Sequence, residues 1–104
     1  MRHDDPAAHE SLDLAWDPDE GVLGKLRSAI FDAELAATYV ALLNSIEIPE
    51  GEPLHADFVR LIWFAPIFTE WQIDEVVKQG AERQAVVKFG DQVRERVMEL
   101  LGTP

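Results

Sequence analysis

The chain of 104 residues contains no cysteine. This absence excludes a disulfide framework, a thiol nucleophile and a zinc site with cysteine ligands. The apolar fraction of 47% is nevertheless typical of a globular protein. Because a chain of this size buries about 60–70% of its unfolded surface, we expect a core that needs neither disulfides nor metal.

Long hydrophobic runs are also missing. The longest covers residues 61–68 and is interrupted by Pro66, whereas a membrane-spanning helix needs about 20 apolar residues. Residues 1–20 contain seven acidic residues against Arg2 and have no apolar stretch typical of a secretory signal. We therefore expect a cytoplasmic protein that does not bind membranes.

Positive charge is scarce, with nine lysines and arginines against 20 acidic residues and a net charge of −11. Such a chain is repelled by nucleic-acid phosphates and by anionic lipid surfaces, which argues against both as partners. A basic protein would be attracted to it. The alternative is that the charge only keeps the protein soluble.

Motifs for catalysis and metal binding are absent as well. The sequence has no phosphate-binding loop, nucleophile elbow, dinucleotide fingerprint, calcium loop or Glu-x-x-His pair. His3 and His9 are six residues apart, which is not the spacing of a ligand pair on a helix. His55 has acidic neighbours, but no serine or cysteine at a spacing that would make it a general base. We assign no catalytic residue, no metal ligand and no cofactor, and expect no enzymatic activity.

What the sequence does have is helical periodicity. The pattern predicts an all-α fold, a compact bundle of about four helices at roughly residues 18–45, 53–64, 70–79 and 81–101. Residues 1–16 are predicted to form an acidic, extended N-terminal tail, and residues 17–104 a single helical domain. In the last helix, the apolar residues recur at spacings of three and four: Val86, Phe89, Val93, Val97 and Leu100.

The first predicted helix is apolar on two flanks. Its start is assigned to Asp17, followed by Pro18 and by Glu20 three residues after the cap. A helix with two apolar flanks lies at the centre of its bundle or is shared with a second copy.

The secondary structure in the middle of the chain is less clearly indicated by the sequence. Residues 58–64 fit either a helix or a strand, and helix is favoured because no second strand is available for pairing. Pro66 is expected to end this helix. Thr69 is expected to cap the next one, with Gln72 returning the capping bond.

Three tryptophans are many for a chain of this length, and several aromatic residues surround Pro66. Trp63 shares a flank of its helix with Val59 rather than lying on the inner face, so it either covers the rim of the core or anchors a partner. Trp71 fits the core better than an interface. The candidate interface residues are Trp63, Phe64, Phe68, Trp71, Trp16 and Val59.

Three functions remain compatible with these observations. The first is a protein-binding module, in its most concrete form an acidic inhibitor or immunity-type protein that neutralises a basic partner. The second is a homodimeric structural or regulatory protein that associates with itself through the first helix. The third is a small ligand-binding or enzymatic bundle, which would need a pocket with converging polar groups.

Overall fold

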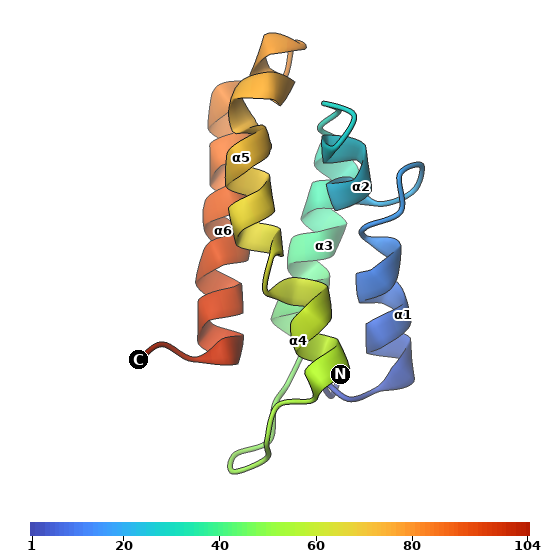
Figure 1. The fold of residues 1–104 in the computed structure, drawn as a ribbon, viewed down its shortest axis with the longest axis vertical. Helices are drawn as coiled ribbons and strands as arrows, with labels where there is room; N and C mark the ends of the chain where they lie inside the picture. Colours follow the sequence, from blue (N-terminus) through green and yellow to red (C-terminus); the bar gives the residue numbers. More distant parts are fainter.

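The computed structural model describes all 104 residues and contains six α-helices and no strand. The helices are α1 (Pro6–Leu14), α2 (Val22–Leu26), α3 (Ala33–Ser45), α4 (Ala56–Ile62), α5 (Ala65–Lys78) and α6 (Arg83–Leu101). As Figure 1 shows, α5 and α6 form a long pair on one side and α1 lies on the opposite side of the molecule. Helix α6 contacts both α5 and α3, α1 packs on α4, and α2 contacts α3 and α5.

The all-α class is confirmed, and so is the last helix. All five apolar positions that define its periodicity are buried in the core. Helix α6 approaches α5 closely at Gly90, where an added Cβ would lie 3.5 Å from the Thr69 methyl group. The segment of residues 58–64, which fitted either a helix or a strand, is helical up to Ile62 and forms most of α4, whose first turn is capped by the His55 side chain.

The prediction of an extended tail over residues 1–16 is wrong, because Pro6–Leu14 forms α1. Asp5 caps this helix by accepting a hydrogen bond from the Ala7 N–H at 2.8 Å, and Pro6 occupies the first helical position, where no N–H is needed. Ala8, Leu12 and Ala15 are buried. Their spacing of four and three forms a narrow apolar stripe, which is enough for a helix that packs along only one side.

A continuous helix over residues 18–45 is also wrong. Helix α2 ends in a left-handed turn at Ala29, where φ is 61°, and the Ile30 N–H closes the turn on the Lys25 carbonyl at 3.0 Å. This is the hydrogen-bond pattern of a Schellman cap. Asp32 then begins α3 by accepting the Leu35 N–H at 3.0 Å. The single long helix behind the homodimer hypothesis is therefore absent.

Pro66 begins a helix rather than ending one. It lies in the first turn of α5, where proline's missing N–H leaves no intrahelical bond unmade. Thr69 is consequently an interior residue of α5, fully buried, and not the cap that the local motif predicted. The helix expected at residues 70–79 exists but starts earlier.

The end of α3 is held by a side chain of α6. The guanidinium of Arg96 donates from Nε to the Leu43 carbonyl at 3.0 Å and from Nη2 to the Ile46 carbonyl at 2.7 Å. A cation at this position also opposes the negative end of the helix dipole. Arg96 thus ties α6 to the last turn of α3.

The left-handed Ala29 gives a first prediction. An L-residue in this region costs about 1–2 kcal/mol, a cost that glycine does not have. We expect Ala29→Gly to raise the free energy of unfolding by up to about 1 kcal/mol, measured by urea denaturation. The control is Ala37→Gly, at an exposed position inside α3, which should lower stability by about 1 kcal/mol. A loss of stability in both variants would contradict the cap assignment.

Arg96→Lys gives a second prediction. Lysine keeps the charge but cannot reach two carbonyls with a planar fork, so we expect a loss of about 2 kcal/mol in unfolding free energy. The matched control is Arg94→Lys, whose guanidinium lies in an exposed ion pair with Asp91. That control should change stability by less than about 0.5 kcal/mol. Equal effects in the two variants would show that Arg96 acts only as a surface charge.

Candidate functional site

Three large apolar side chains are exposed together where α4 gives way to α5. Trp63 is 51% exposed, Ile67 41% and Trp71 67%. They are spaced by four residues, and Ile67 and Trp71 therefore lie on one face of α5. Trp63 precedes that helix, but its ring and the ring of Trp71 both contact Phe64, with centroid distances of 5.3 and 5.4 Å. We call the three exposed residues the apolar ridge.

The ridge rests on a layer of more deeply buried rings. Phe64 is half-buried, contacts Phe68 at 5.9 Å and stacks with Trp16 at 6.4 Å with an interplanar angle of 9°. Phe68 is only 6% exposed. The exposed tryptophans therefore stand on packed neighbours and are not carried by a free loop.

Trp16 connects this layer to the N-terminal helix. It follows the end of α1, and its indole N–H donates to the Leu61 carbonyl at 2.9 Å. In a continuous helix, that carbonyl would accept the N–H of Ala65, a bond that the break between α4 and α5 removes. The Arg27 guanidinium lies 5.5 Å from the Trp16 ring centroid and 5.4 Å from that of Phe68, distances at which a cation is attracted to a ring face.

The charged residues within four positions of Trp71 on α5 are all acidic, whereas Arg27 lies against the rings beneath the ridge. Glu70, Asp74 and Glu75 are exposed and lie one, three and four residues from Trp71 on α5. One of the three, Asp74, is in an exposed ion pair with Arg83 at 3.0 Å. The other two carboxylates have no ion pair. A partner docked on the ridge would therefore meet carboxylates at its edge.

The structure brings five of the six predicted interface residues into one group of rings: Trp16, Trp63, Phe64, Phe68 and Trp71. Trp71 was expected in the core and is instead the most exposed of them. The sixth, Val59, is half-buried on α4 and belongs to none of the ring contacts. Sequence reasoning missed Ile67, although its spacing of four from both tryptophans would have found it had Pro66 been taken as a helix start.

Elsewhere on the surface, the hollows and polar groups can be compared with the needs of a catalytic or metal site. A hollow of about 590 Å³ opens between the residue 46–54 loop and the end of α6 and has no serine, histidine or lysine in its lining. Its one cation, Arg96, already binds backbone carbonyls. No three acidic, histidine or cysteine side chains are grouped so that they could hold a metal ion. Burial raises the pKa of the Tyr39 hydroxyl well above its usual range, so this group stays protonated.

Comparison of the chain with protein-family models, with curated proteins and with solved structures gave no significant match. No helix combines the length and apolar character needed to cross a bilayer. Function is therefore inferred from the geometry and charge of the ridge.

Trp16 gives a third prediction. We expect Trp16→Phe to keep most of the ring packing but to leave the Leu61 carbonyl without its donor, lowering the free energy of unfolding by about 1–3 kcal/mol. Trp63→Phe changes a half-exposed ring that makes no side-chain hydrogen bond and should stay within about 0.5 kcal/mol. Urea denaturation followed by circular dichroism compares the two. Similar small effects would show that the indole bond contributes little.

Proposed function

We propose that the chain is a protein-binding module and that the apolar ridge is its docking surface for a basic partner. The observation that carries this proposal is the exposure of two tryptophans and an isoleucine side by side on a packed support. Tryptophan is enriched among the residues that dominate binding energy at interfaces. Burying one large apolar side chain contributes about 1.5–3 kcal/mol, so the ridge could supply much of an interface's affinity.

Charge supports a basic partner. The carboxylates beside Trp71 and the net charge of −11 attract a positively charged surface and accelerate the encounter. The same charge opposes pairing of the ridge with the ridge of a second copy. The most concrete form of the proposal is an acidic inhibitor or immunity-type protein that neutralises a basic target, such as a nuclease.

The proposal predicts a partner that depends on both the tryptophans and the salt concentration. The chain is used as bait in native lysate at low and high salt, and the captured protein is purified and titrated by calorimetry. We expect a basic protein whose affinity falls with salt and falls at least about 100-fold in Trp63→Ala/Trp71→Ala. Because both side chains are exposed, this double variant should keep its helical circular dichroism spectrum.

The matched control is Met98→Ala, which removes an apolar side chain of 47% exposure on α6, away from the ridge. Its affinity for the partner should equal that of the unchanged chain. Capture that is the same with the double variant, or that does not respond to salt, would exclude the ridge as a docking surface for a basic protein. A molar mass in light scattering that doubles, and returns to the monomer value in the double variant, would favour the homodimer instead.

A further inference from the structure

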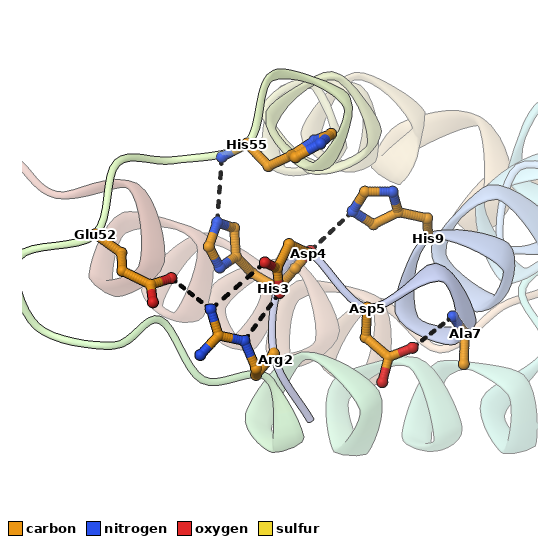
Figure 2. A network of polar contacts seen from close by, with 8 residues as sticks. All are labelled: Arg2, His3, Asp4, Asp5, Ala7, His9, Glu52 and His55. Carbon is orange, nitrogen blue, oxygen red and sulfur yellow. Dashed lines mark hydrogen bonds and ion pairs between the residues drawn. The ribbon is translucent and has the colours of Figure 1, made fainter.

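The three histidines of the chain meet beside the start of α1, although His55 lies 52 residues from His3 in the sequence (Figure 2). The His9 and His55 ring centroids are 5.1 Å apart, and His9 Nε2 lies 2.8 Å from the backbone carbonyl oxygen of His3. The His3 ring is 1% exposed and packs edge-on against Phe58 at 5.2 Å. A residue expected in a loose tail is thus part of the core.

The hydrogen bonds of His3 define its protonation state. The backbone N–H of His55 donates to His3 Nε2 at 3.1 Å, so this nitrogen carries a lone pair and no proton. The ring is therefore neutral, with its proton on Nδ1, a buried atom without any partner. A second proton on the ring would break the bond from His55 and place an unpaired charge in the core, which is costly.

The other two histidines extend this argument. Nδ1 of His55 accepts the Asp57 N–H at 3.3 Å, which again requires an unprotonated nitrogen. Nε2 of His9 donates to a carbonyl and fits either the neutral or the charged ring. Because the His9 and His55 rings are close, charging both would add repulsion.

Backbone contacts beside His3 hold residues 1–5 in place. The Met1 nitrogen donates to the Ser45 carbonyl at 2.8 Å, the Glu47 N–H to the Met1 carbonyl at 2.7 Å, and the His3 N–H to the Glu47 carbonyl at 3.0 Å. This segment leads directly into α1, which packs on α4. Detaching His3 would therefore free residues 1–5 and weaken the support of α1 on α4.

Several charged groups lie on the segments that meet here: Arg2, Asp4, Asp5, Glu10, Glu47, Glu52, Asp57 and Arg60. Arg2 binds Asp4 at 3.1 Å and Glu52 at 2.6 Å, and its hydrogen bond is the largest cause of the lowered pKa of Asp4. The Asp57 carboxylate binds Arg60, and that of Asp5 caps α1. No carboxylate hydrogen-bonds an imidazole nitrogen. The Asp4 carboxylate does interact with His3 through space, but it is already paired with Arg2.

We propose that His3, His9 and His55 form a pH-sensitive latch, which holds residues 1–5 and α1 on α4 when neutral and releases them when protonated. The docked form binds fewer protons than the released form, so a falling pH favours release. Release is thus expected on acidification from neutral pH, before the range in which carboxylates take up protons. This inference is independent of the proposed docking function.

Trp16 offers a direct readout, because its indole leaves the Leu61 carbonyl when α1 detaches. The variant Trp63→Phe/Trp71→Phe changes only two exposed tryptophans and leaves Trp16 as the single reporter. We expect a reversible red shift of its emission between about pH 7 and about pH 5. The absence of any transition above about pH 5 would overturn the proposal.

Two substitutions in this reporter background assign the transition to the histidines. In His3→Gln, the amide oxygen can accept the His55 N–H but takes up no proton. The midpoint of the fluorescence transition should therefore move down to the pH range in which carboxylates are protonated. In His9→Gln, the amide can still donate to the His3 carbonyl, and only the repulsion between charged rings is lost, so the midpoint should move less. An unchanged midpoint in His3→Gln would contradict the latch.

If His3→Gln does not fold, nitrogen-15 NMR of the unchanged chain tests the latch instead. We expect the Nδ1-protonated form of the His3 ring at about pH 8. On acidification, the amide signals of His3, Glu47 and His55 should leave their native positions together as His3 gains its proton. A His3 ring that gains its proton while those three amides keep their native shifts would overturn the proposal.

Discussion

The contact between the Trp16 indole and the Leu61 carbonyl joins the end of α1 to the junction of α4 and α5, 45 residues away in the sequence. It fills the hydrogen-bonding gap left where α4 ends and α5 begins, and it brings the end of α1 to that gap. The ring of Trp16 then supports Phe64, and Phe64 supports both exposed tryptophans. The position of the candidate docking surface thus depends on the indole donor of Trp16 reaching a carbonyl that the helix break leaves without its usual partner.

Two close approaches of the backbone allow Trp16 to reach this position. A Cβ at Gly21 would collide with the Ala15 carbonyl, and a Cβ at Gly24 with the Asp17 carbonyl. The glycines let α2 lie directly against the turn after α1, where the N–H groups of Leu23 and Gly24 both donate to the Ala15 oxygen. Glycine has a low helix propensity, but Gly21 and Gly24 allow α2 to pack closely against the end of α1.

The distribution of charge follows from the same packing. Helix α1 carries the acidic residues Glu10 and Asp13 on its exposed side and buries Ala8 and Leu12, because only a narrow stripe of it faces α4. Its carboxylates stay in water and add to the negative field around the ridge. The acidity that made this segment resemble a tail is compatible with a docked helix, since helix burial depends on one face rather than on mean composition.

The sequence by itself determined the helical class, the last helix and the grouping of aromatic residues around Pro66. These depend on local periodicity, which the chain carries in its apolar spacing. Only the tertiary structure decided that Pro66 starts α5, that Ala29 interrupts the predicted long helix, that Trp71 is exposed and that His3 is buried. Each of these four outcomes depends on contacts between residues distant in the sequence or on a turn whose energy the rest of the fold offsets. The local sequence pattern does not show which face of a helix will pack against another helix. That packing decides whether a tryptophan such as Trp71 lies in the core or on the exposed surface.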